Sequence, residues 1–305
     1  MQELYAFINS GNDSIEKAEK ELFFSINKAY DLFHYILLLL IDIQKYAESR
    51  IELAKDKKIP SFEDLHPNIK FINNKVIEQI NQNVSFNNYI NKLKMSWVNY
   101  PELIKNIYYE ILKNETYIKY MQNSEESYSI DKKIILHIYE EIIANNELLY
   151  QVLEEQSIYW NDDVEFVISM ILKMLEKFKE NQDNATDLPE MYKNNEDIEF
   201  VKIVFHSCIL NHDENVKMIK KFSKNWDIDR IAFMDILLIE MAICEITEMQ
   251  SIPVRVSFNE YIELAKYYST EKSSLFVNGI LDKIIQFLKS ENKIIKKGRG
   301  LIGEN

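Results

Sequence analysis

The stretch Asn225–Ile284 reads NWDIDRIAFMDILLIEMAICEITEMQSIPVRVSFNEYIELAKYYSTEKSSLFVNGILDKI, and it decides the class of this protein. Within it, Asp229–Thr247 is apolar on nearly every side of a helix, which predicts a central, buried helix. Ser257 is followed three residues later by Glu260, so we predict a capping box that starts the next helix at Ser257. We predict that Ser273 begins the last helix. The stretch contains no motif of a catalytic, metal or phosphate site, which favours a binding surface over a reaction site.

Helical spacing also runs through most of the chain upstream of this stretch. From Ile15 to Ala54, apolar residues recur at steps of three and four, with Asp13 as a suitable N-cap and Pro60 beyond the end. This pattern predicts one very long helix or two in tandem. The polar, proline-containing segment Glu180–Asn195 is predicted to be a linker. Further helices are predicted over Phe71–Asn81, Phe86–Trp97, Pro101–Lys113, Asp162–Phe178, Asn195–Asn211 and Asp213–Ser223, with a pair of helices in Ser129–Ser157.

The composition favours an all-α fold. The chain has 305 residues, and 47% of them are hydrophobic, which is enough for a substantial core. Only five Gly and five Pro occur, whereas turn-rich β architectures need many more residues of these two types. We therefore predict helical bundles made of long helices and short connections.

The charge of the chain limits how it can contact nucleic acid. The formal net charge is −13, so any RNA contact must come from a local basic patch that the rest of the surface opposes. The clear basic cluster is Lys289–Arg299, in which Glu291 is the single acid. Two interpretations stay open: a solvated, frayed C-terminus, or an electrostatic handle for RNA. The candidate handle residues are Lys296, Lys297 and Arg299.

Residue types found in catalytic and metal sites are present in the sequence, but they do not have the spacing that such sites require. His206 and His212 are six residues apart and do not share a helix face, so we predict neither a metal site nor a cofactor. The adjacent pairs of Glu residues point about 100° apart on a helix and do not converge on a substrate. Cys208 and Cys244 are predicted to be small, buried hydrophobic residues, with a redox role or a disulfide as the alternatives. We predict that the chain is not an enzyme.

The sequence shows neither a secretion signal nor a membrane span. The apolar run Tyr35–Ile41 has seven residues, whereas a helix that crosses a bilayer needs about 20. We therefore predict a soluble, cytoplasmic protein without membrane contact.

A family resemblance rests on motifs within the same C-terminal stretch. They are WDIDRI at Trp226–Ile231, DIL at Asp235–Leu237, IPV at Ile252–Val254, NEYIELAK at Asn259–Lys266 and FVNGILD at Phe276–Asp282. In order and spacing, these motifs resemble the C-terminal signature of the NusB family of bacterial transcription antitermination factors. Weaker similarity reaches back to about Asn195, and Leu4-Tyr5-Ala6 is similar to the end of the family's first helix.

The resemblance also predicts how the chain is organised. Family members are usually much shorter, and roughly residues 29–193 look like additional helical material, as in long, Bacteroidetes-type forms of the family. We expect an extended helical region that includes this insertion at 1–194, a NusB-like helical bundle at 195–290, and a basic, flexible tail at 291–305.

The resemblance implies binding rather than catalysis. It implies that the chain binds the boxA sequence of the ribosomal RNA leader together with NusE, a small-subunit ribosomal protein. Other Nus factors and RNA polymerase are then indirect partners. Gly279, in mid-helix, is expected to allow the close approach of another helix. By motif position, the candidate RNA contacts are Lys272, Ser273, Phe276 and Asn278, with the Phe276 ring as a stacking platform, and the candidate partner contacts are Asn259, Glu260 and Glu263.

The chain departs from the family at its start. Family members usually begin with an arginine-rich stretch upstream of the Leu-Tyr-Ala element, whereas this chain begins Met1-Gln2-Glu3-Leu4. Either the true start lies upstream, or the grip on RNA is weaker and the basic tail compensates. The alternative function is therefore a helical protein–protein adaptor with little or no RNA binding. The RNA-binding domain of an RNA methyltransferase is disfavoured, because the chain has no Gly-rich cofactor loop.

Overall fold

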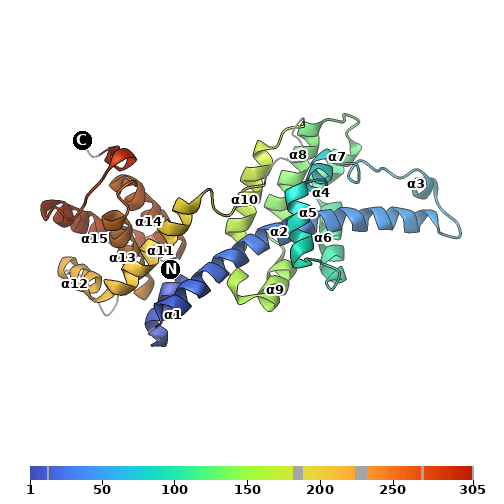
Figure 1. Cartoon of the computed structure of the whole chain (residues 1–305). Coiled ribbons are helices and arrows are strands. Elements are labelled where there is room, and N and C mark those ends of the chain that lie inside the picture. Colours follow the sequence, from blue (N-terminus) through green and yellow to red (C-terminus); the bar gives the residue numbers. More distant parts are fainter. Residues whose placement is uncertain (12–13, 181–187, 224–231, 269–270, 304–305) are drawn as a thin grey trace. The chain divides into compact units, whose positions relative to one another are not determined.

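The computed structural model describes residues 1–11, 14–180, 188–223, 232–268 and 271–303, without the side chains of residues 267, 271 and 272. All regular secondary structure in these residues is helical, which confirms the predicted all-α fold (Figure 1). The chain divides into two compact units. The middle unit is Ser25–Met191, and the C-terminal unit combines Met1–Phe24 with Tyr192–Asn305.

The helices fall into two groups along the chain. Those that lie wholly or largely in the middle unit are α2 (Ile15–Lys55), α3 (Phe62–Leu65), α4 (Lys75–Asn81), α5 (Val84–Leu93), α6 (Pro101–Lys113), α7 (Glu115–Gln122), α8 (Tyr128–His137), the π-helix η1 (Ile138–Ile143), α9 (Glu147–Gln156), the 3-10 turn η2 (Ile158–Trp160) and α10 (Val164–Lys177). Those of the C-terminal unit are α1 (Gln2–Ser10), α11 (Asn195–Leu210), α12 (His212–Phe222), α13 (Phe233–Glu248), α14 (Val254–Tyr268), α15 (Glu271–Ser290) and the 3-10 turn η4 (Gly298–Leu301).

The long helix α2 forms the centre of the middle unit. The apolar spacing left one helix or two open, and the structure has one continuous helix of 41 residues. The seven successive residues Tyr35–Ile41 are all buried, so this part of α2 is covered on every side. Trp97 and Trp160 donate their indole N–H groups to the backbone carbonyl oxygens of Tyr35 (2.9 Å) and Lys28 (2.8 Å). Ring packing and hydrogen bonds therefore hold later segments against the same helix.

By length and composition, α2 could also cross a bilayer. However, 61% of its apolar window is buried inside the protein. Burial of this extent is typical of the core helix of a folded unit. No other helix in the described part of the chain meets the same criteria.

Asparagine side chains begin several helices of the middle unit. Asn74, Asn83, Asn114 and Asn146 are the N-caps of α4, α5, α7 and α9, and each accepts hydrogen bonds from backbone N–H groups of the first turn. These bonds satisfy donors that have no partner within the helix. The predicted helix start at Phe71 is wrong for this reason, because α4 begins only after its cap.

Helix α13 is the central helix of the C-terminal unit, as its apolar sequence predicted. It contacts α11, α12, α14 and α15, and it buries Asp235, Glu240 and Glu245 among its apolar residues. Helix α1 packs against α11 and α13, with Leu4 buried in the cluster that they share. The first residues of the chain therefore belong to the same unit as the last hundred.

Two predicted helix starts in this unit are wrong. Ser257 does not cap a helix, because α14 already begins at Val254, directly after Pro253, and Ser257 is buried within it. A proline fixes φ near the helical value and needs no N–H partner, so it suits this boundary. The last helix begins at Glu271, two residues before the predicted start. The predicted N-cap Asp13 lies outside the described residues.

Gly279 does not serve the role predicted for it. It lies within α15, it is exposed, and a Cβ atom placed on it would meet no atom within 4 Å. Among the described residues, no other helix approaches the backbone at this position, so their packing does not require a glycine there.

Candidate nucleic-acid interface

The outward face of α15 carries one part of the predicted RNA site. Leu275, Asn278, Gly279 and Asp282 are spaced three and four residues apart, so they share one side of the helix, and all four are exposed. Leu275 is 73% exposed although it is large and apolar. The sequence did not predict this residue as part of the site, because an isolated Leu beside a stripe of core residues gives no signal of its own. An amide, an apolar side chain and accessible backbone thus lie together on this face.

Phe276 lies in the core instead of on this face. Its side chain is 4% exposed and belongs to the apolar cluster of α13, α14 and α15. It precedes Ile280 and Ile284 by one and two helical turns, and these residues are buried as well. The ring is therefore covered and does not fit the predicted stacking platform. Ser273 is half-buried, and the side chain of Lys272 lies outside the described residues.

The predicted partner contacts lie on the exposed face of α14. Asn259, Glu260 and Glu263 are all exposed. The carboxylate of Glu263 accepts a hydrogen bond from Lys266 Nζ at 2.6 Å, so its charge is partly compensated one turn further on. Val256 is 47% exposed on the same helix. This face therefore combines carboxylates with apolar surface, which suits a protein partner better than RNA phosphates.

The basic tail docks on the C-terminal unit. Lys296 Nζ donates to a backbone carbonyl oxygen just after α13 (2.8 Å), and the backbone N–H of Lys297 donates to Gln250 O (2.9 Å). Gly300 is buried, and a Cβ atom there would overlap the same Gln250 oxygen. This contact requires a glycine. We expected the tail to be flexible, but these contacts fix it to the C-terminal unit as far as Gly300. The side chains of Lys297 and Arg299 are exposed.

The structure does not bring the candidate RNA residues together at one point. Helices α14 and α15 pack against each other as a hairpin, and Ser273 lies near its connection. The tail follows the opposite end of α15. The span from Ser273 to Ser290 corresponds to roughly 25 Å at about 1.5 Å per residue. A strand that contacts both groups would have to run along α15.

A cluster of polar side chains between α12 and α13 contains residue types that occur in catalytic sites, but it lies in the interior and offers no access to a substrate. His212 Nδ1 lies 3.0 Å from the carboxylate of Glu240, whose side chain is fully buried. Burial raises the pKa of Glu240, and the contact with His212 opposes that rise. Asn215 donates to Cys244 Sγ at 3.3 Å, and Cys208 and Cys244 are buried free thiols, as predicted. These contacts join helices in the interior, so we assign them a structural role.

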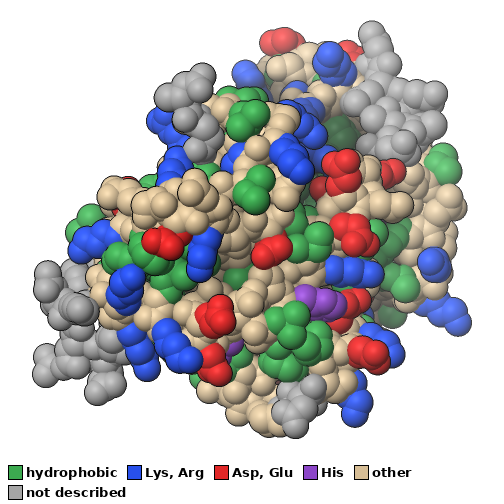
Figure 2. Space-filling model, turned by 60° about the vertical axis from the view of Figure 1, so that its left-hand side comes forward, with side chains coloured by type: hydrophobic (Ala, Val, Ile, Leu, Met, Phe, Trp, Pro, Cys, Tyr) green, Lys and Arg blue, Asp and Glu red, His purple; other side chains and the backbone are tan. Residues whose placement is uncertain are grey.

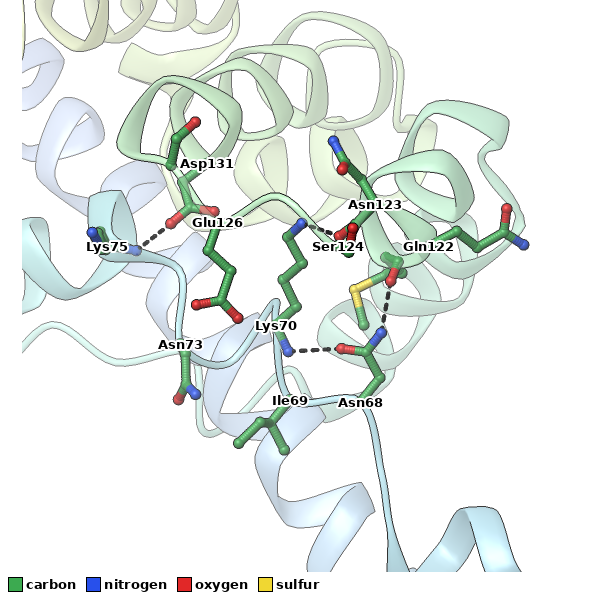
Figure 3. Close-up of a pocket in the computed structure, with 12 residues that line it drawn as sticks. Asn68, Ile69, Lys70, Asn73, Lys75, Gln122, Asn123, Ser124, Glu126 and Asp131 are labelled. Carbon is green, nitrogen blue, oxygen red and sulfur yellow. Dashed lines mark hydrogen bonds between the residues drawn. The ribbon is translucent and has the colours of Figure 1, made fainter.

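A polar hollow of about 310 Å³ lies in the middle unit, between the loops that precede α4 and follow α7 (Figure 3). Lys70 Nζ donates to the backbone carbonyl oxygen of Asn123 at 2.6 Å. The Asp131 carboxylate accepts hydrogen bonds from the Lys75 backbone N–H (3.0 Å) and the Tyr120 hydroxyl (2.8 Å). Because these groups bind one another across the hollow, they join two segments of the protein. In the described residues, no group of three or more His, Cys, Asp or Glu side chains could hold a metal ion.

Comparison with known proteins identifies the family. The NusB family model matches residues 166–286, which run from α10 into α15. The transcription antitermination protein NusB of Finegoldia magna is 42% identical over 93 residues, which are 30% of this chain and 68% of that protein. The chain belongs to the NusB family. Membership in this family, rather than in a family of enzymes, agrees with the prediction that the chain is not an enzyme.

Two further NusB relatives are similar to part of the chain. The protein of Salinibacter ruber is 40% identical over 105 residues, which are 34% of this chain and 66% of the relative. The protein of Chloroherpeton thalassium is 42% identical over 104 residues, which are 34% of this chain and 49% of the relative. The chain thus spans about half to two thirds of the length of these two relatives. No solved structure matches the chain.

Proposed function

We propose that the chain acts in transcription antitermination and that it binds boxA-type RNA jointly with NusE. The main support is the match to the NusB family over residues 166–286, which includes the exposed faces of α14 and α15. Both faces carry residues that the family resemblance pointed to. The proposed action on RNA polymerase is indirect, through NusE and other Nus factors in the cytoplasm.

The two faces suit different ligands. On α15, the Asn278 amide can both donate and accept, as the edges of unpaired bases require. On α14, the carboxylates of Glu260 and Glu263 would repel phosphates, so we assign this face to NusE. At the far end of α15, Lys297 and Arg299 offer exposed cations for the RNA backbone.

A gel-shift experiment with three components tests this proposal. The full chain, NusE and both together are titrated against a boxA RNA and against a scrambled RNA of the same length. We expect the two proteins together to shift the boxA RNA at much lower concentration than either protein alone, and to prefer it over the scrambled RNA. Equal shifts for both RNAs, or no synergy between the proteins, would refute the proposal.

A matched pair of variants tests the face of α15. Asn278→Ala removes an exposed amide on α15, and Asn91→Ala removes one on α5 of the middle unit. A lost hydrogen bond of ~1 kcal/mol corresponds to about a fivefold weaker complex. We expect this loss for Asn278→Ala and unchanged binding for Asn91→Ala. Equal affinities for the two variants would remove the α15 face from the RNA site.

The second candidate function is a protein adaptor that does not bind RNA. The net charge of −13 and the exposed Leu275 favour it. Under this function, the chain binds NusE with little dependence on salt, because no phosphate contacts release counterions. Crosslinking of the complex to boxA RNA would then label NusE alone.

A further inference from the structure

Lysines gather on one side of the C-terminal unit, where α12 packs against α15. Lys217, Lys220 and Lys221 are spaced by three and four residues on α12 and are exposed, whereas Ile219 and Asn215 of the same helix are buried. Lys283 is exposed on α15. We call these four lysines the lysine ridge. Groups of Lys and Arg beside apolar side chains are visible on the face drawn in Figure 2.

The charge of this region differs from that of the rest of the chain. His212–Phe222 and Leu281–Gly300 together contain nine Lys and Arg but four Asp and Glu, in a chain with 36 basic and 49 acidic residues. None of the four ridge lysines forms an ion pair with a residue that the structure describes. The nearby Asp282 carboxylate instead accepts a hydrogen bond from Gln286 at 2.8 Å. Among the described residues, the ridge is therefore a local basic surface whose lysines have no ion-pair partner.

An aromatic pair lies within the ridge. The rings of Phe222 and Phe287 are 5.4 Å apart between centroids, at an interplanar angle of 52°. Lys221 Nζ lies over both rings, at 3.9 Å from the centroid of Phe287 and 5.3 Å from that of Phe222. Both side chains are half-buried, so they are anchored in the unit and still reach its surface. The Lys221 ammonium lies over a face of the Phe287 ring, so a base can stack on that face only by displacing this cation.

The ridge continues the outward face of α15. Gly279, Lys283 and Phe287 follow one another at intervals of four residues, so a line along this helix leads from the Asn278 side to the aromatic pair. Such a line fits a single strand of nucleic acid, whose phosphates contact the lysines and whose bases stack on rings. An acidic protein segment could also contact the lysines, but only its aromatic or Arg side chains could stack on the rings, whereas every base of a nucleic acid has a flat face.

We infer that the lysine ridge binds the backbone of single-stranded RNA that flanks the sequence-specific site, without preference for its sequence. The inference rests on the proposed RNA binding and extends it to a second surface. A ridge of this kind lengthens the contact with the transcript. It also provides basic surface that an acidic chain needs to hold a polyanion.

The test compares RNAs of two lengths and two charge-matched triple variants. One RNA carries the boxA motif alone, and the other carries the same motif with an oligouridine flank on each side. The ridge variant is Lys217→Gln, Lys220→Gln and Lys221→Gln in one chain. The control variant replaces three exposed lysines of the middle unit, Lys133, Lys173 and Lys177, by Gln. Both variants change the net charge equally, and NusE is present throughout.

We expect the wild-type chain and the control variant to bind the flanked RNA more tightly than the bare motif, by roughly tenfold at low salt. The ridge variant should lose this gain and still bind the bare motif normally. Its slope of log affinity against log salt for the flanked RNA should fall by about 2, at ~0.7 per lost single-strand contact.

Each other outcome has a separate meaning. An unchanged length dependence and salt slope in the ridge variant would overturn the inference, even if boxA binding holds. Reduced affinity of the ridge variant for NusE in the absence of RNA would overturn it, because the ridge would then be a contact surface for that protein. If the wild-type chain with NusE binds a scrambled RNA as tightly as the boxA motif, the proposed function fails, and the ridge is still judged by whether its variant loses the gain in affinity from the oligouridine flanks.

Discussion

Replacement of Gly279 by Ala should stabilise the C-terminal unit, against the role that the sequence suggested for this glycine. The residue is the ninth of the twenty in α15, well inside the helix. Glycine in a helix interior is less favourable than Ala by about 0.8–1.0 kcal/mol. The new methyl group meets no atom within 4 Å, so neither a clash nor new burial changes this value. We therefore expect a gain of about 1 kcal/mol.

The assay is equilibrium urea denaturation of the full chain, followed by circular dichroism and by amide hydrogen exchange in α15. With a slope of about 2 kcal/mol per molar urea, the midpoint should rise by about 0.5 M. Hydrogen exchange assigns the gain to the C-terminal unit, because α15 lies there. A lower midpoint would refute the reasoning, since it would mean that another element approaches the backbone at this position.

Gly300→Ala is the matched substitution with the opposite expectation. Its Cβ atom would overlap the carbonyl oxygen of Gln250, so the tail has to leave its docking place. The hydrogen bond from Lys297 N–H to that oxygen (2.9 Å) is then lost. We expect a loss of about 1 kcal/mol and faster exchange of the tail amides. If Gly279→Ala and Gly300→Ala shift the urea midpoint in the same direction, the packing around these two glycines differs from the packing described here.

Three further substitutions test buried polar groups. Ser257→Ala should raise the free energy of unfolding by up to ~1 kcal/mol, because the buried hydroxyl has no hydrogen-bond partner among the described residues. A lower melting temperature of this variant would contradict the prediction. Glu240→Gln should flatten the dependence of stability on pH. Burial raises the pKa of Glu240, so its contribution is present below the unfolded-state pKa and is lost as pH rises through the folded-state pKa. Denaturation of both chains between about pH 4.5 and 8 measures the difference, and parallel profiles would refute it. Asn146→Ala removes the N-cap of α9 and should cost about 1–2 kcal/mol in urea denaturation, whereas a neutral result would mean that the cap bond to Leu149 N–H contributes nothing.

Helix spacing made much of the fold predictable. The steps of three and four between apolar residues over 15–54 correspond to the single helix α2. The predicted helix at 229–247 corresponds to the central helix α13 from Phe233 on, while residues 229–231 lie outside the described part of the chain. Such patterns work because a helix places every third and fourth residue on one side. Helix starts were less predictable. Each of Asn74 and Ser257 could cap a helix by residue type, and only the first one does.

The candidate site was predictable as a segment but not as a surface. Family motifs pointed to α14 and α15, and the family match covers both helices up to residue 286. Within α15, however, Phe276 is buried in the core and Asn278 is exposed to solvent. Leu275 is also exposed on this face, although no motif in the sequence predicted it. A motif shows which residues occur together along the chain. It does not show which side of the helix is covered by the neighbouring helices.

The sequence by itself determined that this protein is helical, where most of its helices run, and to which family it belongs. Tertiary structure alone decided that Met1–Phe24 joins the C-terminal unit, that the tail docks through Gly300, and that Lys221 of α12 contacts the aromatic ring of Phe287 on α15. The physical reason is the range of the interactions. Helical periodicity relates residues that are three or four positions apart, so a short stretch of sequence is enough to predict a helix. Contacts between segments that are far apart in the sequence depend on which helix faces become buried when the whole chain folds.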